Sequence, residues 1–373
     1  MKREYILFSQ EAEDLPADFD QHVATINADI TKFVERSPTV SNTNYHTRDA
    51  HAKGYAALKA EFTILDNLPE ELAQGIYARP GKHEAVIRLS NGAARAFPDR
   101  FSGNAQGLAI KVLSVPGKKL SPGEEDTPNV DFNLINHPIF FCNSSHDYMF
   151  IDKLFHRLHE YFDKGAWGKI ELAYLWTTEM GKAFPSRNTL RELKALLSFQ
   201  DIKPQNTLLY NFYSMGAVRH GEYIAKLRVS PCEESVKKVR QIEVNVDKDD
   251  EAYRKSILET IRDQDFKFEF QVQLCKDLKK MPVNDLTVEW PQDLSPFQTV
   301  AELYVPRQEV DADGNFEIME HLSFTPFRCL EANRPMGDLQ MARLKAYQIS
   351  SKTRHQLNGK ERKEPQTLKE LFG

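Results

Sequence analysis

Apolar and polar residues alternate through several segments of the chain, which is the pattern of β-strands. In the first, from Gly54, the apolar side is formed by Leu58, Ala60, Phe62 and Ile64. Further strand-like runs cover 83–90, 107–115, 222–230, 266–275 and 299–305. Strands spread along the chain, with helices inserted between them, predict a mostly antiparallel sheet or barrel wrapped by helices rather than a regular βαβ alternation.

Helical spacing of apolar residues appears between these strands. Residues 19–34 form the first such pattern, and Ser37-Pro38 is expected to end that helix. Four more helical patterns lie at 148–161, 169–180, 190–197 and 249–262. The stretch from Gly337 to Gln348 is also compatible with a helix.

The composition is that of an ordinary globular protein, because 41% of the 373 residues are hydrophobic and 28% are charged. A net charge of -5 without a long basic run argues against a nucleic-acid partner. The four cysteines stand far apart with no C-x-x-C pair, which favours isolated thiols over a zinc site. The apolar stretch at the N-terminus is too short for a signal peptide and no long apolar segment follows, so we expect a cytoplasmic protein without integral membrane association.

A candidate ligand pair lies near the end of the chain, where Arg343 and Tyr347 stand four positions apart in the helix-compatible stretch. This spacing puts both side chains on one helix face. A guanidinium beside the phenol oxygen, together with Fe(III), would favour the phenolate that binds iron. Such pairs also arise by chance in many helices, so the spacing alone leaves both interpretations open.

His51 is a candidate acid–base residue in the segment just before the first strand. A neutral imidazole near a bound peroxide can take its proton and return it to the leaving oxygen, which is the proton transfer that cleavage of the O–O bond requires. A loop histidine can equally be structural or exposed. His46 and His51 could also bind a metal, although no carboxylate or third histidine follows at a suitable spacing.

Two further segments carry polar side chains beside apolar ones. On the strand at 83–90, Arg88 and Ser90 share one face and are expected to point into the barrel, where a buried arginine needs an anion. In the segment 131–141, the amide of Asn133 or Asn136 could donate a hydrogen bond to a bound oxygen. A polar turn that closes a strand is the alternative for these asparagines.

Four segments, in their order along the chain, resemble the catalase family. They are Arg48-Asp-Ala-His-Ala-Lys-Gly, Val86-Ile-Arg-Leu-Ser, Asn136-His-Pro-Ile-Phe-Phe and Arg343-Leu-Lys-Ala-Tyr, and Asp285-Leu-Thr-Val-Glu-Trp-Pro is also similar. The resemblance covers about residues 45–357. It implies an α+β fold in which helices wrap a catalase-like antiparallel β-barrel, with haem b buried between the barrel and the helix that bears Tyr347. The expected parts are an N-terminal arm and helix (1–44), the barrel core with inserted helices (45–336), and the haem-ligand helix with a C-terminal tail (337–373).

The resemblance also implies roles for single residues. His51 would be the distal acid–base residue, Ser90 the hydroxyl that orients it, and Asn136 the distal amide. Tyr347 would bind the haem iron, with Arg343 bonded to its oxygen. The haem propionates would be held by Arg48, Arg88 and Arg354.

The sequence departs from the family pattern around the expected haem. When the motif is aligned on Pro138, Ile135 rather than Asn136 falls at the position of the distal asparagine. Ala50 stands where the family has a valine, and Asn104 where it has a channel aspartate. A smaller residue over the haem and a neutral channel both weaken the selection for hydrogen peroxide. We also expect neither the family's long threading arm nor its C-terminal helical domain.

The function that the resemblance implies is a haem b-dependent, peroxide-metabolising enzyme, a catalase-related peroxidase acting on hydrogen peroxide or organic hydroperoxides. A fatty-acid hydroperoxide isomerase or dehydratase of the allene oxide synthase type is one alternative, and a haem-binding protein without turnover is another. The expected partner is the small-molecule peroxide. The oligomeric state stays open, with a homo-oligomer among the options.

Overall fold

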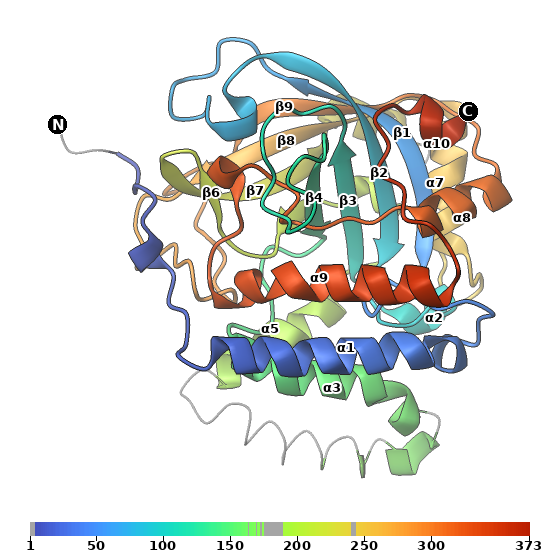
Figure 1. The fold of residues 1–373 in the computed structure, drawn as a ribbon. Helices are drawn as coiled ribbons and strands as arrows, with labels where there is room; N and C mark the ends of the chain where they lie inside the picture. The colour runs from blue at the N-terminus through green and yellow to red at the C-terminus, as the bar shows by residue number, and fades with distance from the viewer. Residues whose placement is uncertain (1–3, 163, 169, 172–173, 175–188, 240–243) are drawn as a thin grey trace.

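The computed structural model describes residues 4–373 except 163, 169, 172–173, 175–188 and 240–243 (Figure 1). Its strands are β1 (Gly54–Ile64), β2 (Gly81–Asn91), β3 (Gln106–Val112), β4 (Val130–Ile135), β5 (Phe212–Ser214), β6 (Val218–His220), β7 (Tyr223–Pro231), β8 (Phe266–Leu274) and β9 (Gln298–Val305). Its α-helices include α1 (Phe19–Ser41), α2 (Asp99–Ser102), α3 (Ser145–Phe162), α5 (Thr189–Ser198), α6 (Glu233–Lys238), α7 (Ala252–Asp263), α8 (Ala312–His321), α9 (Asp338–Leu357) and α10 (Lys369–Phe372).

The strands form an antiparallel barrel, which confirms the expected α+β architecture. They follow the order β5-β4-β3-β2-β1-β9-β8-β7-β6, and β5 also pairs with β7. This pairing closes eight strands into a barrel and leaves β6 attached to β7 alone. The helix expectations at 148–161, 190–197 and 249–262 are confirmed by α3, α5 and α7, whereas most of 169–180 lies outside the described residues.

The barrel is filled with apolar side chains from alternate positions of each strand. Phe62 of β1, Ile87 of β2 and Phe270 of β8 are fully buried in this core. The three phenylalanines of β8 all belong to it. Burial of each side chain of this size stabilises the fold by about 1.5–3 kcal/mol. The apolar side of each strand therefore faces the interior, and the residues between the apolar ones face outward.

Arg88 and Ser90 therefore lie on the outer wall, and the prediction that they point into the barrel is wrong. Because Ile87 and Leu89 of the same strand occupy the apolar interior, the period of two places their neighbours outside. Arg88 nevertheless points toward the segment that carries His51, because its Nη2 donates to the backbone oxygen of His51 at 2.8 Å.

A layer of helices covers one end of the barrel (Figure 1). Helix α9 runs beside the barrel, α1 lies against α9, and α3 lies against α1. Ile26, Ile30 and Val34 of α1 pack against Ala346 and Ile349 of α9. The layer holds α9, which bears Tyr347, against the strand ends of the barrel.

Helix α1 continues past Ser37-Pro38 to Ser41, so the expected end of this helix is wrong. Pro38 has no N–H to donate to the carbonyl of Val34. That carbonyl instead accepts from the Ser37 hydroxyl at 2.8 Å and lies 2.9 Å from His46 Nδ1. Because these contacts replace the lost hydrogen bond, the helix continues to Ser41. It ends at Asn42, whose φ of 51° is left-handed.

A buried ionic cluster ties the C-terminal tail to the outer wall of the barrel. Lys111 of β3 contacts Asp131 of β4 at 2.8 Å and Glu364 of the tail at 2.9 Å. Arg328 contacts Asp131 and also reaches Glu364 at 3.0 Å. The side chains of Lys111 and Asp131 are fully buried, so these contacts replace the water that each charge has lost.

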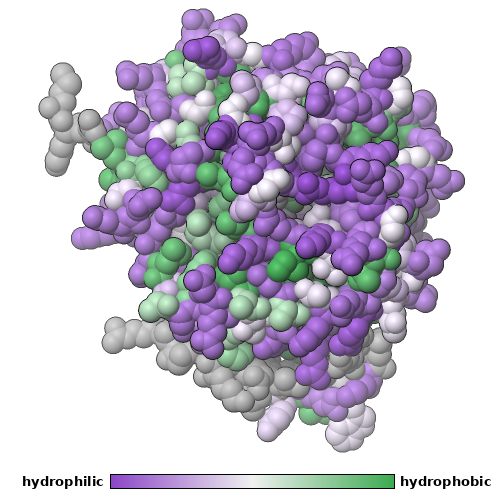
Figure 2. All heavy atoms as spheres, viewed as in Figure 1, coloured by the Kyte–Doolittle hydropathy of each residue, from purple (hydrophilic) through white to green (hydrophobic). Residues whose placement is uncertain are grey.

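The outer surface is polar over most of the face seen in Figure 2. No helix within the described ranges is long and apolar enough to cross a membrane.

Candidate active site

His51 is held in one orientation by the end of β2. Its Nδ1 lies 2.7 Å from the carbonyl oxygen of Asn91 and 3.3 Å from Ser90 Oγ. A carbonyl oxygen can only accept, so Nδ1 carries the hydrogen and Nε2 keeps its lone pair. The backbone at His51 has a φ of 55°, a left-handed conformation that non-glycine residues seldom adopt outside functional or turn positions.

The His51 ring is neutral over the physiological pH range. Burial and the neighbouring Arg88 guanidinium lower the pKa of His51 to about 4. With Nδ1–H committed to Asn91, the free Nε2 can accept a proton and return it.

Gly107 of β3 makes room for the His51 ring, and the sequence analysis missed it. A Cβ at this position would lie 2.5 Å from His51 Nδ1 and 3.1 Å from Ser90 Oγ. Gly107 pairs with Ser90 across the two strands, so the bare backbone forms the surface on which the ring rests. A glycine inside a strand pattern is the signal that could have revealed this close approach.

Arg343 and Tyr347 meet on one face of α9, as their spacing predicts. Arg343 Nη2 donates to the Tyr347 hydroxyl oxygen at 2.9 Å, and Nη1 donates to Gln340 Oε1 at 2.6 Å. The phenol oxygen thus has a cationic donor fixed beside it.

The segment that carries His51 is fastened to α9 at two points. The Ser350 hydroxyl donates to the Asp49 carboxylate. Asn358 exchanges two hydrogen bonds with the backbone of His46, at 2.7 and 2.9 Å. Two motifs about 300 positions apart in the sequence, around His51 and Tyr347, are therefore brought to one site.

Three arginines, of which Arg88 and Arg354 are buried, gather around one carboxylate beside this site. Arg48 Nη1 lies 3.0 Å from Glu320 Oε1, and Arg354 Nη1 lies 2.7 Å from Glu320 Oε2. Arg88 is close enough for its charge to act on Glu320. Glu320 lies on α8, and the sequence analysis did not identify it.

The arginine cluster is short of negative charge. Burial opposes ionisation of Glu320, yet the guanidiniums of Arg48 and Arg354 lower the pKa of this carboxyl to about 2. Burial and Arg48 lower the pKa of Arg354 to about 9, and the same causes hold the pKa of Arg88 well below its usual range. Within the described part of the chain, the buried Nε atoms of Arg88 and Arg354 have no hydrogen-bond partner. Two more carboxylates would balance the charge of the three guanidiniums and accept hydrogen bonds from them.

The structure gives the amides of Asn136 and Asn104 local partners. Asn136 Oδ1 accepts from the Gln106 N–H at 2.7 Å, and Nδ2 donates to the Asn104 carbonyl at 2.9 Å. Asn104 in turn accepts from the Tyr253 hydroxyl and donates to the Ile202 carbonyl, both at 2.6 Å. Asn136 therefore joins the start of β3 to the end of β4, and we leave it out of the acid–base set.

His46 and His51 do not form a metal site with other ligands in the part of the chain that is described. His46 Nδ1 is engaged by the Val34 carbonyl. In the same part, no three His, Cys, Asp or Glu side chains are grouped to hold a metal ion.

Comparison with known proteins bears on the fold. No protein-family model and no curated protein matches the sequence. Among solved structures, a fungal catalase is similar with a TM-score of 0.62 and 15% identity, over 86% of this chain and 62% of that one. Catalase A from Saccharomyces cerevisiae is similar with the same TM-score and identity, over 96% of this chain and 70% of that one. The chain has the catalase fold.

A bacterial catalase gives the same result, with a TM-score of 0.60 and 14% identity over 89% of this chain and 63% of that one. The chain thus spans 62% to 70% of the length of these catalases. The catalase fold accounts for the closed barrel and for the helix layer that carries Tyr347.

Proposed function

We propose that the chain is a haem b-dependent enzyme that consumes hydrogen peroxide or an organic hydroperoxide. The observation that carries the proposal is the arginine cluster, in which Arg48, Arg88 and Arg354 share the carboxylate of Glu320. Haem b brings two propionates, which would supply the missing negative charges. The catalase fold and the Arg343–Tyr347 pair on α9 support the same cofactor.

The residues around His51 also fit a flat cofactor on the outer wall of the barrel. Arg88 pairs with Ala109 and Ser90 pairs with Gly107 across β2 and β3. Because Ala109 and Gly107 have little or no side chain, the outer wall beside Arg88 and Ser90 has room for a flat molecule. Tyr347 would hold the haem iron through its phenol oxygen, to which Arg343 donates a hydrogen bond.

Haem, when bound, supplies the electrons that break the peroxide O–O bond. His51 does the proton transfer: Nε2 takes the proton from the bound peroxide and delivers it to the oxygen that leaves. The Asn91 carbonyl keeps Nδ1–H in place throughout, so the ring does not need to reorient between the two transfers. General acid–base help of this kind contributes about 10²- to 10⁴-fold to the rate.

Two substitutions test the proposal separately. Tyr347→Phe should lose haem or change the absorption spectrum of the bound haem, because it removes the ligand oxygen. His51→Ala should retain haem and lose peroxide reactivity by about 10²- to 10⁴-fold. Tyr304→Phe, which removes a phenol hydroxyl from the outside of β9, serves as the matched control and should change neither.

The measurements are the haem absorption spectrum, the peroxide consumption rate and the products. An unchanged spectrum in Tyr347→Phe would exclude the ligand assignment. A haem spectrum without reaction towards any peroxide would make the chain a haem-binding protein. An epoxide or ketol formed from a lipid hydroperoxide would instead identify a dehydratase or isomerase.

A further inference from the structure

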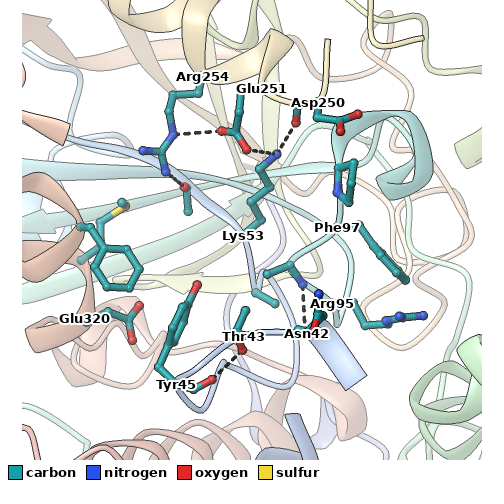
Figure 3. Close-up of a pocket in the computed structure, with 17 residues that line it drawn as sticks. Asn42, Thr43, Tyr45, Lys53, Arg95, Phe97, Asp250, Glu251, Arg254 and Glu320 are labelled. Carbon is teal, nitrogen blue, oxygen red and sulfur yellow. Dashed lines mark hydrogen bonds and ion pairs between the residues drawn. The ribbon is translucent and has the colours of Figure 1, made fainter. Parts of the chain in front are cut away.

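A cavity of about 480 Å³ lies directly beside the arginine cluster (Figure 3). Ala52, Lys53 and Gly54, which follow His51 in the chain, form one side of it, and Glu320 forms another. A Cβ at Gly54 would lie 3.3 Å from Arg88 Nη2 and 2.6 Å from the Met319 sulfur, so the cavity wall at Gly54 lies close to that guanidinium. The proposed peroxide chemistry does not use this space.

The cavity has aromatic walls. The rings of Tyr45 and Phe316 meet edge to face with centroids 5.0 Å apart, and Phe97 lines the opposite part beneath the guanidinium of Arg95. Met319 adds a polarisable thioether. Walls of this kind favour a flat ring over an aliphatic chain.

The charges around the cavity balance. Lys53, Arg95 and Arg254 are matched by Asp250, Glu251 and Glu320. Lys53 is held by Asp99 and Glu251, both at 2.8 Å, and Arg254 donates to the Gly54 carbonyl at 2.8 Å. A balanced lining does not favour a phosphate or another polyanion, and it suits a neutral ligand.

One polar group points into the cavity and lacks a partner. Figure 3 shows the Tyr45 side chain directed into the space between Lys53 and Glu320. Among the described residues its hydroxyl makes no hydrogen bond. It can therefore pair with a hydroxyl of a bound molecule.

We propose that this cavity binds a small neutral phenol, which serves as the electron donor of the enzyme. The inference rests on the proposed peroxide function. Two phenols each give up one electron and one proton to one hydroperoxide, which yields an alcohol, water and two phenoxyl radicals. Tyr45 fixes the donor ring beside the arginines that hold the haem propionates.

Calorimetric titration of the haem-loaded full chain with guaiacol tests the site without turnover. Wild type should bind guaiacol. Tyr45→Phe should weaken binding about 5- to 10-fold through the lost hydroxyl contact, and Phe316→Leu should weaken it through the lost ring. Phe372→Leu, at the C-terminal end of the chain, is the matched ring-loss control and should leave binding unchanged.

The kinetic counterpart separates this inference from the proposed function. In Tyr45→Phe, kcat/KM for guaiacol should fall while the rate of reaction with peroxide stays at the wild-type value. No binding of guaiacol at millimolar concentration, or binding that neither cavity variant changes, would overturn the donor site even if the protein consumes peroxide. A protein without haem or peroxide reactivity would refute the proposed function instead, whatever the calorimetry shows.

Discussion

Replacing Gly107 with alanine crowds the His51 ring without removing any group that forms hydrogen bonds with it. The new Cβ would lie 2.5 Å from Nδ1, whereas ordinary contacts begin at 3.4 Å, so the ring must move by about 0.9 Å. The Cβ would also lie 3.1 Å from Ser90 Oγ, which limits retreat on that side. A misplacement of about 1 Å costs on the order of 10²-fold in rate, so we expect Gly107→Ala to lower kcat/KM for peroxide by about that factor.

The assay compares initial rates of peroxide consumption at equal haem content. Gly81→Ala on β2 is the matched control, because a Cβ there would meet only His83 at 3.5 Å, and it should keep the wild-type rate. In a His51→Ala background, Gly107→Ala should have no further effect, since both act through the same ring. A Gly107→Ala variant with the wild-type rate, or one whose loss adds fully to that of His51→Ala, would refute the reasoning.

Three further predictions follow from the site. Since the pKa of His51 is lowered to about 4 and the neutral ring is the active form, peroxide reactivity should be flat from neutral pH downward and fall only as the pH approaches that value, which a pH–rate profile measures. Glu320→Gln leaves buried guanidiniums without their carboxylate and should lower the free energy of unfolding by about 3–5 kcal/mol in urea titrations, with haem restoring part of the loss. Ala50→Val and Asn104→Asp should each shift the ratio of kcat/KM values toward hydrogen peroxide over a bulky hydroperoxide; a ratio that neither changes would contradict a widened access route.

The strongly periodic strands could be predicted from the sequence. The alternation identified β1 with its core-facing residues and the run at 266–275 that is β8, because the filled barrel enforces a period of two. The same rule also shows why Arg88 was misplaced. Arg88 and Ser90 were correctly placed on one face of the strand. The interior is apolar and takes Ile87 from the other face, so the face with Arg88 lies outside.

Short or composite features could not be predicted. Strands β5 and β6 have three residues each, too few to show a period, and β4 is not among the strands predicted from the sequence. Glu320 gives no local signal because its role depends on Arg48 and Arg354, which reach it from distant parts of the chain. Pro38 also misled the sequence analysis, which took it for the end of a helix. The groups that replace its missing N–H at the Val34 carbonyl are brought there by the tertiary structure, which the sequence pattern does not reveal.

The contact between Lys111 and Glu364 sets the order in which parts of the molecule can finish folding during synthesis. Lys111 lies in the middle of the barrel wall and is synthesised long before its second carboxylate, which arrives with the C-terminal tail. A growing chain that stops short of residue 364 leaves Lys111 and Arg328 without one of their carboxylate partners. The wall strands can pair during synthesis, but the barrel gains its full charge balance only when the tail has been released and docks.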